Sequence, residues 1–250
     1  MCIRDRLKRG IFLSIFLLSA SCETQNSSDN QIITNDIEKD NSKLNEIDII
    51  NSSVSKFSFL ALGDSYTIGE GVEESKRWPN QFIKIAYDKG LYFEKPKIIA
   101  KTGWKTYDLL NAINKTNFTK KYDYVSLLIG VNNQFNSRSI YEFEEDLDKI
   151  MDKIDIIRKN NGSTIIISIP DWGYTPFAES YNRDTISYEI NIFNKSLKNF
   201  ADKNDIKYVD VTEISRKTLN EDDLLASDSL HPNGLMYFEW AKKIYEKWID

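Results

Sequence analysis

Histidine is almost absent from this 250-residue chain, in which His231 is the only one. No other side-chain type has an unperturbed pKa near neutrality, so any imidazole base at neutral pH must be His231. The two cysteines, Cys2 and Cys22, lie in the first 22 residues, which leaves the rest of the chain without a disulfide. That part also lacks a thiolate or multi-histidine metal site. An all-carboxylate site for a hard cation stays open, although no motif for one is present.

The chain also lacks an excess of positive charge. The chain has 33 Lys and Arg residues against 38 Asp and Glu, a formal net charge of -5, and no basic run outside its extreme N-terminus. Binding to nucleic acid needs a basic face, so this composition excludes nucleic acid as a partner. The hydrophobic content of 41% is ordinary for a globular protein.

The N-terminus has the pattern of an export signal. A basic segment over residues 4–9 precedes the apolar run Ile11–Leu18, which is too short to span a bilayer as a helix. Small residues then lead to Cys22. Residues 1–22 resemble a bacterial lipoprotein signal, with Ser19 where leucine is usual. The resemblance implies cleavage before Cys22, lipid anchoring at Cys22 and a place in the cell envelope; plain secretion is the alternative.

Residues 23–56 contain no aromatic residue and are rich in Asn, Ser, Asp, Glu and Lys. Such a segment buries too little apolar surface to offset the entropy lost on ordering. We expect a disordered linker here, with a short helix over 40–50 as the alternative, and a single folded domain over 57–250.

Short apolar runs alternate with longer amphipathic segments in the folded domain. The expected strands are Phe57–Leu62, Lys97–Lys101, Tyr124–Ile129, Thr164–Ile169 and Lys207–Val211. The expected helices are Pro79–Lys89, Thr106–Asn114, Ile140–Lys159, Thr185–Lys203 and Gly234–Trp248. Continuous apolar strands are typical of parallel sheets covered on both faces. The alternation predicts an α/β fold: a three-layer α/β/α, flavodoxin-like domain with a five-stranded parallel sheet in the order 2-1-3-4-5.

In an open parallel sheet, ligands bind at the carboxyl ends of the strands. Ser65 follows the first expected strand, Gly103 the second and Asn132 the third, while Asp228 and His231 come after the fifth. The strand order would place Ser65 between Gly103 and Asn132.

These residue types suit acyl transfer. A serine hydroxyl is a weak nucleophile until a base removes its proton, and His231 is the available base. Asp228 lies three residues before it and could orient its ring. The amides of Ser65 and Gly103 and the side chain of Asn132 could stabilise the oxyanion of a tetrahedral intermediate. Glycine at 103 would let the backbone approach closely.

Four sequence blocks carry these residues: Gly63-Asp64-Ser65, Thr102-Gly103-Trp104, Gly130-Val131-Asn132-Asn133 and Asp228–His231. Taken together, they resemble the blocks of the SGNH/GDSL hydrolases, a family of esterases and lipases, over residues 57–249. The resemblance implies Ser65 as the nucleophile, Gly103 and Asn132 as oxyanion donors, and Asp228 and His231 as the closing pair. It also implies a serine esterase without cofactor or metal, acting on small-molecule esters or on acylated glycans or lipids.

Two positions depart from the family pattern. Tyr66 replaces the usual leucine after the nucleophile, and we expect it to affect packing or the substrate wall. Asn133 replaces the usual aspartate, which removes a charge beside Asn132. Asp64 is a rival for the role of triad acid, but it adjoins Ser65, so we expect it to bond backbone amides in its own loop.

Other serine and phosphate motifs do not fit. A classical nucleophile elbow needs glycine where Thr67 stands, and a phosphate-binding loop is excluded because Glu70 follows Gly69. Two functional alternatives stay open: an acyltransferase using the same site, and a non-catalytic module that binds glycans or a partner protein.

The segment after the fourth expected strand carries three aromatic residues, Trp172, Tyr174 and Phe177. They could stack on a sugar or line an acyl pocket. They could equally form the packed underside of a long loop, and the sequence favours neither.

Overall fold

The computed structural model describes residues 55–249. The predicted signal over 1–22, the anchor at Cys22 and nearly all of the predicted linker lie outside the described residues. Within residues 55–249, no helix is both long enough and apolar enough to cross a membrane.

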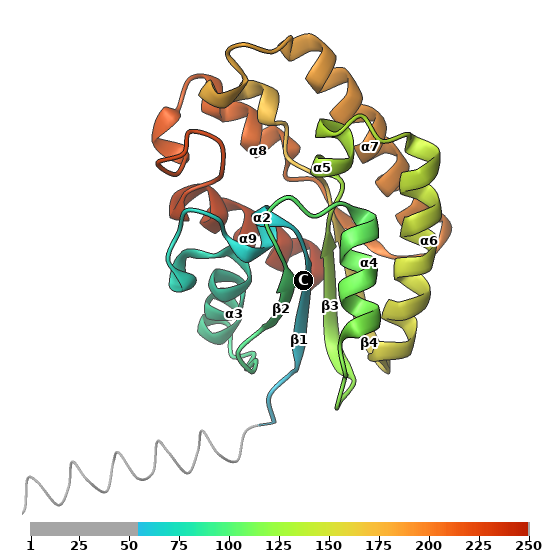
Figure 1. The fold of residues 1–250 in the computed structure, drawn as a ribbon. Helices are drawn as coiled ribbons and strands as arrows, with labels where there is room; N and C mark the ends of the chain where they lie inside the picture. Colours follow the sequence, from blue (N-terminus) through green and yellow to red (C-terminus); the bar gives the residue numbers. More distant parts are fainter. Residues whose placement is uncertain (1–54, 250) are drawn as a thin grey trace, which may run out of the picture. The chain divides into compact units, whose positions relative to one another are not determined.

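Five parallel strands form one sheet (Figure 1). The strands are β1 (Phe59–Gly63), β2 (Lys97–Ala100), β3 (Tyr122–Leu128), β4 (Arg158–Ile167) and β5 (Lys207–Val209). Their order is β2-β1-β3-β4-β5, and every neighbouring pair is parallel. This confirms the predicted α/β fold and strand order. The chain therefore adds strands on one side of β1 and then on the other, so the strand order reverses at β1. Ligand sites of such folds lie at this point.

Helices cover both faces of the sheet, as its apolar strands require. All five residues of β1 are buried. In Figure 1, α3 (Trp78–Asp88) and α9 (Gly234–Trp248) lie together on one side of the sheet. The other side carries α4 (Thr106–Lys115), α6 (Ile140–Ile157) and α7 (Arg183–Lys203). The result is the predicted three-layer architecture.

Aromatic rings fill the space between β1, α3 and α9. The ring of Trp248 lies 5.5 Å from that of Phe59 and 5.4 Å from that of Phe82, and all three are buried. Burying large rings of this kind is a main source of folding free energy, about 1.5–3 kcal/mol for a phenylalanine side chain. This packing fixes α9, and with it the chain that follows His231, against the first strand.

The short helices were not predicted. They are α2 (Ser65–Ile68), α5 (Val131–Phe135) and α8 (Thr212–Arg216), together with 3-10 turns at Glu74–Lys76, Trp172–Tyr174, Pro176–Ala178, Lys217–Leu219 and Asp222–Leu224. Segments of three to five residues are too short for a hydrophobic period to reveal. Both α2 and α5 begin within three residues of a strand end, so they position the residues at the carboxyl edge.

The prediction for the longest helix was wrong at its C-terminal end. It was expected to reach Lys159, but α6 stops at Ile157 and β4 begins at Arg158. The start of β4 is irregular: Tyr122 pairs with Arg158, whereas Tyr124 pairs with Ser163. The Arg158 guanidinium donates to the carbonyl of Gly162 at 2.8 Å and closes this bulge. The polar residues within the bulge concealed the strand from sequence reasoning.

Candidate active site

Ser65 is the first residue of α2 and follows β1 after a tight turn. Glycine at 63 is a steric requirement, because a Cβ there would lie 2.2 Å from the hydroxyl of Thr67. The carboxylate of Asp64 caps α2 by accepting the backbone N–H of Tyr66 at 3.0 Å. At the first helical position, the N–H of Ser65 has no acceptor within its own helix. The turn thus leaves this N–H available to a ligand at the carboxyl edge of the sheet.

Asp64 is fully buried, with 0% of its surface exposed. Burial raises the pKa of Asp64 to about 7, although hydrogen bonds from the Tyr66 N–H and the Asn132 side chain act to lower it. The second of these is long, with 3.4 Å between Asn132 Nδ2 and Asp64 Oδ2. The bond to Tyr66 is the loop contact expected from the sequence. Through its other oxygen, Asp64 also contacts Asn132, the candidate oxyanion donor.

His231 is almost buried and is bonded to Asp228. Its Nδ1 lies 2.6 Å from Asp228 Oδ2, and the other carboxylate oxygen accepts the backbone N–H groups of His231 and Leu230 at 2.9 and 3.0 Å. Partial burial acts to raise the pKa of Asp228, but these hydrogen bonds bring it below its usual value. An ionised carboxylate can only accept, so we assign the proton of the neutral ring to Nδ1, which leaves Nε2 as the basic nitrogen.

A tight turn holds this pair together. Ser229 has a left-handed backbone, with φ of 58°, and its N–H donates to the carbonyl of Ala226 at 3.0 Å. Ala226 in turn donates to the carbonyl of His231 at 2.8 Å. This short loop brings the Asp228 side chain back over the histidine that follows it.

Gly103 lies in a turn closed by the N–H of Trp104, which donates to the carbonyl of Lys101 at 3.2 Å. Its φ is +81°, and an added Cβ would meet no atom within 4 Å. The left-handed backbone is one reason for glycine here, because other residues rarely adopt it at the third position of such a turn. Close approach to a substrate stays a prediction.

Asn132 lies on α5, immediately after β3. Its side-chain nitrogen donates to the carbonyl of Trp104 at 3.1 Å, which directs the amide toward the turn that contains Gly103. The neighbouring Asn133 is buried and joins α5 to the start of α4: its Oδ1 accepts the N–H of Thr106 at 3.0 Å, and its Nδ2 donates to the Thr106 hydroxyl at 2.8 Å. Asparagine at 133 therefore supplies both an acceptor and a donor, which an ionised carboxylate cannot.

A pocket of about 160 Å³ unites the candidate residues. The side chains and backbone that line it are Ser65, Tyr66, Thr102, Gly103, Val131, Asn132, Phe135, Trp172, Phe177, Leu230 and His231. Four of the five residues singled out for catalysis thus border one space, and the fifth, Asp228, contacts His231 from behind. Within the described chain, no group of three or more His, Cys, Asp or Glu side chains is placed to hold a metal ion.

Tyr66 supports the histidine ring. The two ring centres lie 5.1 Å apart at 54°, and on its other side Tyr66 stacks against Trp240 of α9 at 6.2 Å. Tyr66 also lines the pocket. The departure from leucine at this position therefore affects both packing and the wall of the site.

The aromatic residues after β4 divide between the two roles that the sequence left open. Trp172 is buried, lines the pocket, and donates its Nε1–H to Gln134 Oε1 at 2.7 Å. Phe177 lines the pocket and remains 42% exposed. Tyr174 packs away from it between two guanidinium groups, at 5.3 Å from Arg183 and 5.8 Å from Arg216. One loop therefore has both a packed side and a ligand-facing side.

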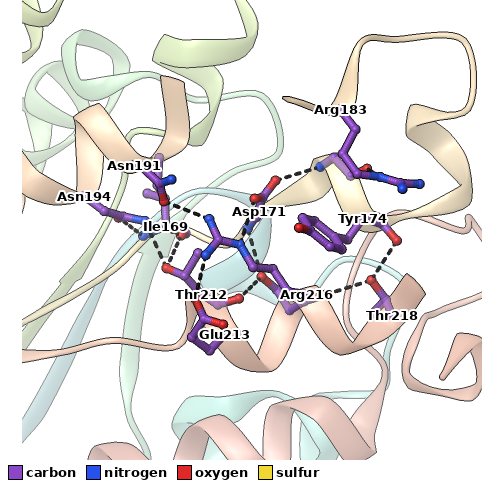
Figure 2. A network of polar contacts seen from close by, with 12 residues as sticks. Ile169, Asp171, Tyr174, Arg183, Asn191, Asn194, Thr212, Glu213, Arg216 and Thr218 are labelled. Carbon is purple, nitrogen blue, oxygen red and sulfur yellow. Dashed lines mark hydrogen bonds and ion pairs between the residues drawn. The ribbon is translucent and has the colours of Figure 1, made fainter. Parts of the chain in front are cut away.

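Figure 2 shows the polar network behind this loop. Arg216 extends from α8 and donates from Nε to the fully buried carboxylate of Asp171 at 3.0 Å and from Nη2 to Asn191 at 2.7 Å. The other oxygen of Asp171 accepts the N–H of Gly173 at 3.0 Å, and Thr218 donates to the carbonyl of Tyr174 at 3.1 Å. These contacts fix the loop from the side opposite the pocket.

Sequence reasoning missed Phe135, Gln134 and Arg216. The first two follow the Asn132 block within two or three residues, and their position on a helical turn was the only available signal. Arg216 lies far along the chain from Asp171, and no spacing rule links them. These three residues shape the pocket or hold its wall.

The profile of the GDSL-like lipase/acylhydrolase family matches residues 61–237. The chain belongs to this family. Membership makes it a hydrolase of acyl esters, and the match includes all five candidate residues. A search of curated protein sequences finds no match.

Solved structures of this class share the fold. A lipase, Lip_vut3, from a goat rumen metagenome has 20% sequence identity and a TM-score of 0.63, covering 77% of this chain and 97% of its own. A member of the lipolytic G-D-S-L family from Veillonella parvula has 20% identity and a TM-score of 0.57, covering 76% and 96%. Axe2, an acetylxylan esterase from Geobacillus stearothermophilus, has 16% identity and a TM-score of 0.60, covering 77% and 94%.

Proposed function

We propose that this protein is a serine esterase that hydrolyses carboxylic esters through an acyl-enzyme intermediate. Ser65 is the nucleophile, His231 the base and Asp228 the residue that orients it. The observation that carries the proposal is the shared pocket of Ser65, Gly103, Asn132 and His231, with His231 bonded to Asp228 at 2.6 Å. In Axe2, a serine-to-alanine and an aspartate-to-alanine substitution each give a catalytic mutant, which supports a role for both residue types.

In the first half-reaction, the Ser65 oxygen bonds to the ester carbonyl carbon while His231 Nε2 takes the hydroxyl proton. The tetrahedral intermediate then collapses, the carbon–oxygen bond to the alcohol breaks, and the imidazolium returns its proton to the leaving alkoxide. In the second half, the same imidazole deprotonates a water that attacks the acyl-enzyme. Collapse of the second intermediate releases the acid and returns the proton to Ser65.

The oxyanion hole consists of the N–H groups of Ser65 and Gly103 and the side-chain amide of Asn132. The N–H of Ser65 has no acceptor within α2, because Ser65 is the first residue of that helix. The Asn132 nitrogen has two hydrogens, and its 3.1 Å bond to the carbonyl of Trp104 takes one of them. The second hydrogen makes only a long bond to Asp64 Oδ2, at 3.4 Å, which a carbonyl oxygen in the pocket can replace.

Covalent labelling tests the nucleophile directly. The wild-type protein is incubated with a fluorophosphonate probe, and Ser65→Ala is treated in parallel, with Ser187→Ala as a control serine on α7 outside the pocket lining. We expect labelling of the wild type and of Ser187→Ala, and none of Ser65→Ala. Equal labelling of the wild type and Ser65→Ala, or none of either, would overturn the proposed mechanism.

The acceptor in the second half-reaction distinguishes a hydrolase from an acyltransferase. Product analysis with p-nitrophenyl butyrate, with and without glycerol or a sugar alcohol, measures the ratio of acid to new ester. We expect the free acid to predominate in both conditions. A new ester as the main product would assign the site to acyl transfer.

We also propose that the chain is exported to the bacterial cell envelope and anchored by a lipid on Cys22. The basic and apolar segments before Cys22 support this proposal. Expression in a bacterium fed a palmitate analogue, followed by membrane fractionation, tests it. We expect label in the membrane fraction and loss of label in Cys22→Ser.

A further inference from the structure

The active-site pocket is strongly divided by polarity. Its polar groups belong to Ser65, Thr102, Gly103, Asn132 and His231, which lie around the nucleophile. Its apolar lining comes from Val131 and Phe135 of α5, from Trp172 and Phe177 in the loop after β4, and from Leu230 beside His231. Among the described residues that line it, none is an Asp, Glu, Lys or Arg. An uncharged, apolar space beside a nucleophile suits an apolar group of the substrate.

Aromatic rings extend this apolar side beyond the pocket. Phe135 lies 5.3 Å from Trp172 and 6.3 Å from Tyr181, and Phe177 stacks on Tyr181 at 6.2 Å and 18°. Phe135, Phe177 and Tyr181 are 45%, 42% and 48% exposed. We call these three residues the aromatic ledge. It is a half-exposed apolar surface that continues outward from the pocket lined by Ser65.

A sugar is a poor match for this surface. Sugar sites place polar groups next to aromatic platforms to bond the hydroxyls, and here the one indole N–H of the wall, that of Trp172, is already bonded to Gln134 at 2.7 Å. Glu189 is engaged as well, since it accepts the side-chain N–H of Gln134 at 2.7 Å. A hydrocarbon chain needs no such partners.

The size of the pocket sets a chain length. An apolar cavity of about 150 Å³ holds a benzene ring, that is, six carbons. The pocket here, about 160 Å³, also has to hold the ester carbonyl. It therefore encloses an acyl group of about four to six carbons, and a longer chain would continue over the ledge, where water remains on one side.

We propose that the apolar wall of the pocket, which includes Phe135 and Phe177, and the aromatic ledge that continues it form an acyl-chain site that makes this protein selective for butyryl and hexanoyl esters over acetyl esters. The proposal rests on the esterase mechanism proposed above. Each methylene buried in the pocket should raise kcat/KM about fourfold, so that butyryl exceeds acetyl by about sixteenfold. Beyond six carbons the gain for each methylene should become small, because the ledge buries only one side of the chain.

A chain-length series tests the proposal. The kcat/KM values of the full-length protein are measured for p-nitrophenyl acetate, butyrate, hexanoate, octanoate and palmitate, each divided by the rate of alkaline hydrolysis of the same ester. We expect a steep rise to hexanoate followed by a plateau. A maximum at acetate, or equal values throughout, would overturn the proposal. So would a higher kcat/KM for acetylated oligosaccharides than for the hexanoate.

Variants of the ledge identify the residues that select the chain. In Phe177→Ala and Phe135→Ala, the hexanoate-to-acetate ratio of kcat/KM should fall at least fivefold. Phe238→Ala is the matched control, because Phe238 is also 45% exposed but lies on α9 outside the pocket lining. Its ratio should equal that of the wild type. A ratio that survives in both ledge variants would overturn the proposal.

The two proposals fail in different ways. If the protein hydrolyses none of these esters, or if Ser65→Ala is as active as the wild type, the esterase mechanism fails and the selectivity with it. If hydrolysis depends on Ser65 but the chain-length profile is flat, only the acyl-chain site is wrong.

Discussion

Replacing Asp64 with asparagine should change the free energy of unfolding more favourably at pH 8 than at pH 5. Asp64 is fully buried, and burial raises its pKa from 3.8 to about 7. The folded protein therefore binds the proton of this carboxyl more tightly than the unfolded chain does. Between pH 3.8 and 7 the folded state binds more protons, so the stability due to this group falls as the pH rises through that window and levels off above it.

The magnitude follows from these two pKa values. Asp64 costs the fold about 2 kcal/mol at pH 5, where it must take up a proton, and about 4 kcal/mol at pH 8, where its charge is buried, at about 1.4 kcal/mol for each tenfold change in proton affinity. Asparagine carries no such cost and is as good a helix N-cap as aspartate, so it can still accept the N–H of Tyr66. Its amide nitrogen would face the nitrogen of Asn132, which adds a penalty of about 1–3 kcal/mol that does not vary with pH.

A double difference removes that constant penalty. The free energy of unfolding is measured by urea denaturation for the wild type and Asp64→Asn at pH 5 and pH 8. The effect of the substitution should be more favourable at pH 8 by about 2–3 kcal/mol. Asp123→Asn is the control: burial acts to raise the pKa of Asp123, but hydrogen bonds from Ser58 and Lys159 bring it below its ordinary value. Its charge state is then the same at pH 5 and pH 8 in both states, so the effect of this substitution should not change.

One result would refute the reasoning. If the effect of Asp64→Asn differs by less than about 0.5 kcal/mol between the two pH values, a small fraction of the expected difference, the carboxyl is not held at a raised pKa.

Three further predictions concern the site and its supports. Ser65→Ala and His231→Ala should each remove most of the activity, and the double variant should be no worse than either, because the residues act as one unit; additive losses in kcat would contradict this. Asn132→Ala should raise the activation barrier by roughly 3–4 kcal/mol, and a loss in kcat of less than tenfold would assign the oxyanion to other donors. Arg216→Ala leaves the carboxylate of Asp171 buried without its cation, so urea denaturation should show a loss of about 3–5 kcal/mol.

The sheet could be predicted because its signal is distributed over many residues. Each strand is a run of apolar residues and each long helix has an apolar stripe, so errors at single positions do not change the pattern. The strand order also fixes which loops meet, and this is why Ser65, Gly103, Asn132 and His231 could be expected at one edge before any coordinates. Boundaries were less secure: β4 begins in the polar sequence of a bulge, where no apolar period marks it.

The walls of the pocket could not be predicted in the same way. Phe177 and Tyr174 lie three residues apart in one loop, yet one faces the pocket and the other packs between Arg183 and Arg216. The difference arises from tertiary contacts with α7 and α8, and irregular backbone has no fixed period that would assign a side chain to a face. A sequence can therefore name the aromatic residues of such a loop but not which of them meet the substrate.

The support of that loop extends to the oxyanion donor itself. Asn132 lies on α5, a helix of five residues, and so short a helix has little stability of its own. Its position depends on side chains such as Gln134, which bonds to Trp172 at 2.7 Å. Trp172 in turn follows Asp171, which Arg216 holds from behind. The apolar wall of the pocket and the oxyanion donor are thus joined by one network of hydrogen bonds. A change that loosens the wall should therefore reduce kcat as well as alter the preferred chain length.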